Sequence, residues 1–218
     1  QEEEKENPDP AKPARDPAEI VNNEQLYLTG LHLEQYRHAT YDPRDYYEEA
    51  LRRDPSDSRC NNALGLWYLR RGQFGKAEDY FRKAVTTLTE RNPNPINGEP
   101  LFNLGLAQVF QGKDEEAYAS FHKSVWNAAW VDSGYFELAR LNAKSGNWKD
   151  ALDEVGRSLS RNVHHHKARQ LKASILRKLD RKEEAEQWVE SSLARDMFNF
   201  SMYYERALLN PGSSSSKE

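Results

Sequence analysis

NNALGLWYLRRGQFGKAEDYFRKA, residues 61–84, is the stretch of sequence that decides the fold. Its informative positions are small, aromatic or turn-forming: Leu64, Gly65, Tyr68, Gly72, Ala77, Phe81 and Ala84. The pattern returns along the chain, with Ala117, Ala151 and Ala185 following Ala77 at spacings of 40, 34 and 34 residues. The turn positions Gly72, Gly112, Gly146 and Asp180 keep the same spacings. A fixed period of this size predicts stacked supersecondary units, none of which can bury its apolar face alone.

Each residue type in the pattern has a physical reason to recur. We expect Gly65 and Gly105 to lie where the two helices of a hairpin approach closely, with the repeated alanines serving the second helix in the same way. Phe81 and Phe121 are large enough to fill the space between successive hairpins, and burying one such side chain contributes roughly 1.5–3 kcal/mol. Gly72 and its equivalents end the first helices, where a left-handed residue satisfies free carbonyls without a Cβ penalty.

These positions resemble the tetratricopeptide repeat family, whose pattern spans two antiparallel helices. The match is in register over five units; the first unit keeps Tyr27, Tyr47, Ala50 and Pro55 but has its glycine at Gly30 and Pro43 in place of an alanine. The resemblance implies an all-α fold, a right-handed superhelical solenoid of about five helix-turn-helix hairpins with a C-terminal capping helix.

The expected boundaries follow the repeats. Residues 1–21 form an acidic, Pro-rich linker, and the solenoid occupies 22–197, with repeats at about 22–56, 57–91, 98–131, 132–165 and 166–197. A capping helix follows at 198–210, and a flexible tail at 211–218. Six extra residues around 91–98, rich in Pro and Asn, predict an ordered turn or a protruding loop between the second and third repeats.

The charge of the chain restricts the classes of partner. Residues 1–19 hold seven acidic and three basic residues, a net charge of −4, which equals that of the whole chain. The repeat region is therefore electrically balanced, which argues against nucleic acid as a partner, because phosphates need a basic surface. No apolar run approaches the ~18 residues of a membrane span. Cys60 is the only cysteine, so we expect no internal disulfide and a cytoplasmic location.

Catalytic, cofactor and metal sites are not expected. The sequence has no Gly-rich phosphate loop, nucleophile elbow or zinc-helix motif. His164, His165 and His166 are consecutive, so on a helix their side chains would point about 100° apart, whereas metal ligands must converge. We therefore predict no enzyme activity and no cofactor in this segment.

The resemblance places ligand-binding positions on the concave face, which the first helix of each hairpin lines. The corresponding candidates are His32, Gln35, Arg59, Asn62, Phe102, Asn103, Phe136, Arg140, Lys167, Gln170 and Arg177. Asparagines at such positions can bind a peptide backbone, and arginines can pair with carboxylates. The chain has Asn62 and Leu66 where the carboxylate clamp of the family's chaperone-binding members has Lys and Asn, which argues against that clamp.

Trp126 and Trp130 allow two interpretations. Large aromatic residues most often pack in a core, here at the junction of the third and fourth repeats. The alternative is an aromatic platform for a sugar or a peptide.

Two functions remain open at this stage. The first is a protein-interaction module that binds an extended, acidic peptide or a partner domain in the concave groove; the acidic residues 1–19 are themselves a candidate guest. The second is an internal scaffold of a larger enzyme, for which carbohydrate processing is one candidate activity. Segments such as Leu31–Tyr41 and Val125–Trp130 resemble the helical part of large bacterial multidomain proteins that also carry a β-rich domain of unknown function. The oligomeric state is not predicted.

Overall fold

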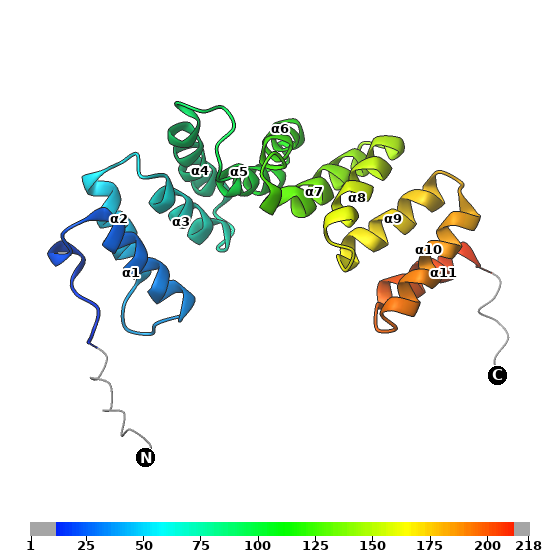
Figure 1. Cartoon of the computed structure of the whole chain (residues 1–218), viewed down its shortest axis with the longest axis horizontal. Helices are drawn as coiled ribbons and strands as arrows, with labels where there is room; N and C mark the ends of the chain where they lie inside the picture. Colours follow the sequence, from blue (N-terminus) through cyan, green and yellow to red (C-terminus); the bar gives the residue numbers. More distant parts are fainter. Residues whose placement is uncertain (1–11, 212–218) are drawn as a thin grey trace, which may run out of the picture.

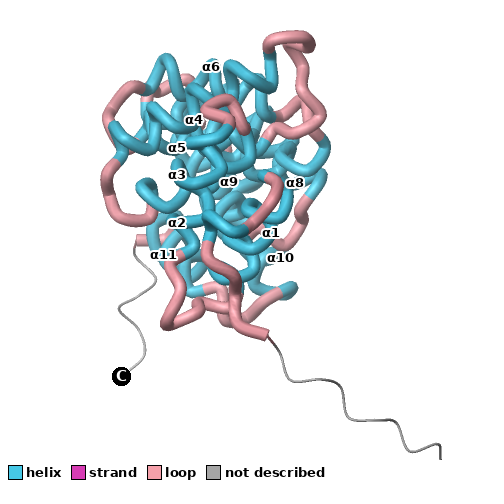
Figure 2. Tube along the Cα trace, turned by 90° about the vertical axis from the view of Figure 1, so that its left-hand side faces the viewer, coloured by secondary structure: helices cyan, strands magenta, loops and turns pink. Residues whose placement is uncertain are grey.

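The computed structural model describes residues 12–211, which form an arch of helices (Figure 1). Five antiparallel hairpins follow one another: α1 (Asn23–Gln35) with α2 (Pro43–Arg53), α3 (Ser58–Leu69) with α4 (Phe74–Thr89), α5 (Glu99–Val109) with α6 (Asp114–Ser124), α7 (Val131–Lys144) with α8 (Trp148–Arg161), and α9 (His166–Lys178) with α10 (Lys182–Arg195). A single helix α11 (Phe200–Leu209) ends the arch, and η1 (Pro17–Glu19) and η2 (Ala128–Trp130) are short 3-10 turns. Within residues 12–211 there is no strand, as Figure 2 shows in a view along the arch. The all-α solenoid predicted from the repeats is confirmed.

Close contact inside the hairpins depends on glycine. A Cβ added to Gly65 would lie 2.4 Å from Cε1 of Phe81, and one added to Gly105 would lie 2.6 Å from Cε1 of Phe121. Gly30 meets Tyr47 in the same way, at 2.6 Å. The first hairpin therefore uses the same glycine–aromatic contact as the second and third.

The turns inside the hairpins share one backbone motif. Gly72, Gly112 and Gly146 have φ between 71° and 80°, and Asp180 has a φ of 57°. In each case the second helix begins two residues later. In the first hairpin the equivalent residue is Arg37, with a φ of 50°, and α2 begins only at Pro43. The first turn is therefore longer than the others and lacks a glycine.

The core passes continuously from hairpin to hairpin. Ala77 and Phe81 of α4 pack with Leu104 and Ala107 of α5. Equivalent clusters join α6 to α7 and α8 to α9. The first helices also touch one another, α1 with α3, α3 with α5 and α7 with α9, which places them on the inner side of the curve (Figure 1).

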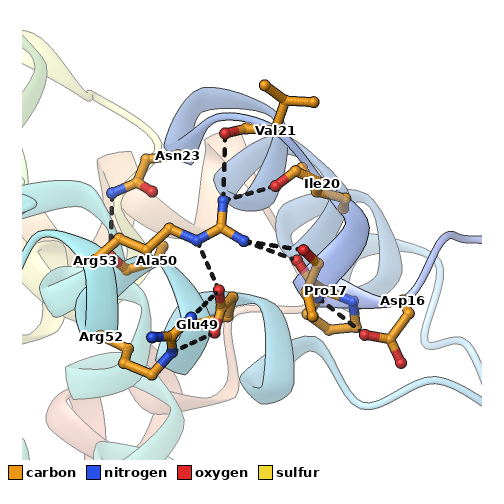
Figure 3. Close-up of polar contacts among 10 residues, drawn as sticks. Asp16, Pro17, Ile20, Val21, Asn23, Glu49, Ala50, Arg52 and Arg53 are labelled. Carbon is orange, nitrogen blue, oxygen red and sulfur yellow. Dashed lines mark hydrogen bonds and ion pairs between the residues drawn. The ribbon is translucent and has the colours of Figure 1, made fainter.

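Residues 15–21 of the N-terminal segment pack against the first hairpin. The sequence predicts a linker for these residues. Ile20 is buried, and the Tyr46 hydroxyl donates a hydrogen bond of 2.9 Å to the Arg15 carbonyl. The Arg53 guanidinium donates to the carbonyl oxygens of Pro17, Ala18, Ile20 and Val21 (Figure 3). Composition predicts flexibility, but Arg53, the Tyr46 hydroxyl and the buried side chain of Ile20 hold this strap, residues 15–21, in place. The rest of the expected linker, at 1–11, and of the tail, at 212–218, lies outside the described residues.

Helix α11 covers the last hairpin. Met202 and Leu209 join the cluster of Ala173, Leu176 and Val189. Its outer side is uncovered, since Phe200 is 74 % and Tyr204 61 % exposed.

The insertion near residues 91–98 forms a protruding loop between α4 and α5 (Figure 1). Ile96 is exposed at its tip, while the Ile96 carbonyl accepts a hydrogen bond from the Asn127 side chain. The loop is thereby tied to the segment that joins α6 to η2.

Candidate functional site

The asparagines on the inner side of the second and third hairpins are bonded to each other. Asn103 Nδ2 donates to Asn62 Oδ1 at 3.0 Å, and Asn62 Nδ2 donates to Glu99 Oε1 at 3.1 Å. Both asparagines are buried. Their side-chain amides therefore join α3 to α5. The sequence pattern instead predicts that these amides are free to bind a peptide backbone.

Arg59 is similarly engaged with its surroundings. Its guanidinium forms ion pairs with Glu24 and Asp57, and it lies 4.9 Å from the centre of the Tyr27 ring. His32 and Gln35, by contrast, are exposed on α1, with the His32 ring 4.5 Å from that of Tyr36. Of the candidates in the first two hairpins, His32 and Gln35 are therefore exposed, whereas Arg59 is partly buried and already ion-paired.

The tryptophans at the junction do not form a common platform. Trp130 stacks on Phe102, with ring centres 4.7 Å apart, and Phe102 in turn contacts Phe121. Trp126 is 68 % exposed. The packing interpretation holds for Trp130 and the candidate Phe102, whereas Trp126 faces solvent.

The structure brings four predicted residues together in one pocket between α7 and α9. Phe136 and Arg140 lie on α7, and Lys167 and Gln170 lie on the first turns of α9. The pocket has a volume of about 460 Å³ and is completed by Glu137, Leu171 and Ser174. We call it the α7–α9 pocket.

The α7–α9 pocket holds one buried acidic side chain and two exposed basic ones. Glu137 is buried, which raises the pKa of its carboxyl group, while Arg140 and Lys167 act in the opposite direction. Glu137 Oε2 accepts a hydrogen bond of 2.7 Å from Arg140 Nη1. Lys167 forms no ion pair within residues 12–211, so the pocket retains one unmatched positive charge.

A comparison with protein-family models decides the family. The tetratricopeptide repeat model matches residues 44–95 and 136–200, just over half of the chain. The chain belongs to the tetratricopeptide repeat (TPR) family. The TPR period is the spacing found in the sequence, and the match covers both the second hairpin and the α7–α9 pocket.

Solved structures share the fold at low sequence identity. YrrB, described as a TPR protein with an unusual peptide-binding site, superposes with a TM-score of 0.68 at 16 % identity, covering 83 % of this chain and 90 % of YrrB. PilW, described as a widely conserved type IV pilus biogenesis factor, gives a TM-score of 0.67 at 23 % identity, with 84 % and 82 % covered.

A curated relative also carries TPR repeats. The TPR and J domain-containing co-chaperone DNJ1 of Fusarium oxysporum is 28 % identical over 104 residues, which are 47 % of this chain. The aligned part is 19 % of that protein, so the chain matches about a fifth of the length of its relative.

The last groove candidate of the TPR chain serves the end of the solenoid. Arg177 Nε donates to Glu205 Oε2 at 3.1 Å, and Ser174 donates to the other oxygen at 2.5 Å. Glu205 is buried on α11. The sequence makes Arg177 a candidate for ligand binding. In the structure it is paired with Glu205 and fastens the capping helix.

The three consecutive histidines have different surroundings. His165 packs against Phe136 at 4.6 Å, whereas His166 lies near Asn199 and Asp196. Within residues 12–211, no group of three His, Cys, Asp or Glu side chains could hold a metal ion. No helix in the same range is long and apolar enough to cross a membrane.

Sequence reasoning missed Glu137 as part of the α7–α9 pocket. It follows Phe136 directly and precedes Arg140 by three positions, a helical spacing that brings acid and base together. That spacing was the signal available in the sequence. Glu137 was missed because it is not one of the ligand positions of the repeat.

Proposed function

We propose that this chain binds an extended acidic peptide along its concave face, anchored in the α7–α9 pocket. Membership of the TPR family supports a protein-interaction module in general. The observation that carries the finer proposal is the gathering of Phe136, Arg140, Lys167 and Gln170 around one cavity.

Each group in the α7–α9 pocket has a defined role in this proposal. Lys167 is exposed and pairs with a carboxylate of the guest, because it forms no ion pair with an acidic side chain within residues 12–211. The Gln170 amide supplies a donor and an acceptor to the peptide backbone. Phe136 and Leu171 provide apolar surface beside the charges.

Glu137 sets the selectivity of the α7–α9 pocket. Its carboxylate holds Arg140 at 2.7 Å, which orients the guanidinium while leaving other N–H groups available. A basic peptide would meet Lys167 and Arg140 first and be repelled, since both are exposed while Glu137 is buried. The guest is therefore acidic.

Fluorescence anisotropy with a labelled ten-residue Asp/Glu peptide tests the proposal. The variant Arg140→Ala/Lys167→Ala should bind at least about tenfold more weakly, because two charge-assisted contacts are removed. Affinity of the unaltered chain should also fall as salt is raised. The matched control is Lys149→Ala, an exposed lysine on α8 away from the pocket. Equal affinities of all three proteins, or equal binding of a Lys/Arg peptide, would contradict it.

A second candidate function is that of an internal scaffold, and one observation favours it. The outer side of α11 exposes Phe200, Tyr204 and Leu208, next to exposed Met197 and Phe198. Uncovered apolar surface of this kind is typical of a docking face for another domain. A larger protein with its enzyme activity elsewhere is consistent with this face. If Arg140→Ala/Lys167→Ala leaves binding unchanged while Phe200→Ser/Tyr204→Ser abolishes association with the rest of the parent protein, the scaffold is the better account.

A further inference from the structure

The turn between α1 and α2 departs from the other four turns in two ways. Arg37 occupies the left-handed position, with a φ of 50°, where the next three hairpins have glycine. Its backbone N–H bonds to the Glu34 carbonyl and that of His38 to the Leu33 carbonyl, the same pattern that Gly72 and Gln73 make. A non-glycine residue at this position carries backbone strain, and here it places a guanidinium on the turn.

The longer turn borders a cavity on the first two hairpins. Four residues, 39–42, follow His38 before α2 begins at Pro43. Together with the end of α3 they enclose a cavity of about 530 Å³. Arg37 comes from the turn, and Trp67, Arg70 and Arg71 come from α3 and the residues after it. We call this the first-turn cavity.

The acidic side chains of the first-turn cavity are already paired. Glu34 forms an ion pair with Arg70 and accepts a hydrogen bond of 3.0 Å from the Tyr47 hydroxyl. Asp42 accepts from Arg44 Nε at 2.9 Å. These pairs leave Arg37 and Arg71 without a carboxylate partner within residues 12–211.

The guanidinium of Arg71 is held in place before any ligand arrives. It lies 3.5 Å from the centre of the Trp67 ring, and its Nη1 donates to the Trp67 carbonyl at 3.1 Å. Arg44 lies 4.4 Å from the same ring. Partial burial, and secondarily the neighbouring charge of Arg71, lower the pKa of Arg70.

We propose that Arg37, Arg70 and Arg71 bind a phosphate monoester carried by a phosphorylated side chain of a partner protein. A phosphate offers three acceptor oxygens and close to two negative charges, which several guanidiniums can share, whereas a carboxylate is satisfied by one arginine fork. The cavity is larger than a phosphate and includes Leu33, Ala39 and Pro43, which gives the attached peptide apolar surface. The site belongs to the first two hairpins and is separate from the α7–α9 pocket.

Anisotropy with a labelled Ala-Ala-pSer-Ala-Ala peptide tests the site, with the Ser and Glu versions as ligand controls. The unaltered chain should bind the phosphopeptide at least about tenfold more tightly than either. The variant Arg37→Gly/Arg71→Gln should lose this preference. Glycine suits the left-handed backbone, so the variant keeps its fold, which a thermal melt verifies. The matched control Arg161→Gln, on α8, should bind like the unaltered chain.

Other outcomes overturn the assignment. Equal binding of the phosphoserine and Glu peptides would mean a general acidic patch, and unchanged binding by Arg37→Gly/Arg71→Gln would place the phosphate elsewhere. Inorganic phosphate should compete with the peptide; if it binds alone while the phosphopeptide does not, the guest is a free anion. Arg140→Ala/Lys167→Ala should leave phosphopeptide binding intact, so failure here and failure of the groove proposal are distinguishable.

Discussion

At the scale of single residues, close helix packing in each of the first three hairpins rests on one glycine facing one aromatic ring. Phe81 is fully buried against Gly65, and a Cβ at that position would have to displace the ring. Gly156, on α8, has no neighbouring atom within 4 Å of the place where a Cβ would lie. The two glycines occupy helices but differ in what surrounds them, so the same substitution should have opposite effects.

We expect Gly65→Ala to lower the free energy of unfolding by about 1–3 kcal/mol, because the ring of Phe81 must move within a packed core. Gly156→Ala should raise it by about 0.5–1 kcal/mol, since alanine restricts the unfolded chain and favours helix. Urea unfolding of both variants measures the difference. Stabilisation by both substitutions would show that helix propensity outweighs the local contact with Phe81.

Residue-scale reasoning from the sequence located groove positions but not their partners. Asn62, Asn103 and Arg59 were expected to meet a ligand, whereas neighbouring hairpins supply their hydrogen-bond and ion-pair partners. Helical register tells which face a side chain is on. Which groups from another hairpin reach it depends on how the hairpins pack.

At the scale of elements, the strap shows that a Pro-rich segment can be held by few contacts. Arg53 donates hydrogen bonds to four backbone carbonyls of the strap (Figure 3). Its Nε also donates to Glu49 Oε1 at 2.6 Å, which positions the guanidinium. Arg52 binds the same Glu49 but makes no contact with the strap. This neighbouring pair offers a matched comparison.

Arg53→Met should release the strap, and we expect a loss of about 1–2 kcal/mol, because hydrogen bonds from a charged donor are lost at a half-exposed site. Hydrogen exchange of the amides at 18–22 should become faster. Arg52→Met is the control and should leave that exchange unchanged. If the strap stays protected in Arg53→Met, the burial of Ile20 and the hydrogen bond from Tyr46 are sufficient to hold it.

At the scale of the whole molecule, each hairpin contacts mainly its neighbours, so stability is a sum of local and nearest-neighbour terms. The central hairpins have a neighbour on both sides. The first is covered on its outer side by the strap, and the last by α11 alone. The ends should therefore open before the centre.

Hydrogen exchange of the full chain measures this gradient. Amides in α5–α8 should exchange most slowly, and those in α1, α10 and α11 fastest, because local opening at an end breaks only one interface. Equal protection along the chain would instead indicate one cooperative unit. Gly156→Ala should slow exchange in α8 more than in α1.

The sequence by itself determined the all-α hairpin solenoid, because the contact between Gly65 and Phe81 and the turn at Gly72 lie within one short segment and repeat with a fixed period. It also pointed to Phe136, Arg140, Lys167 and Gln170, which share a pocket because α7 and α9 are one repeat apart. Only the tertiary structure decided which candidates remain free. Asn62 and Asn103 are 41 positions apart, and Arg177 is 28 from Glu205. The packing angle between hairpins brings such groups together, and no local pattern encodes that angle.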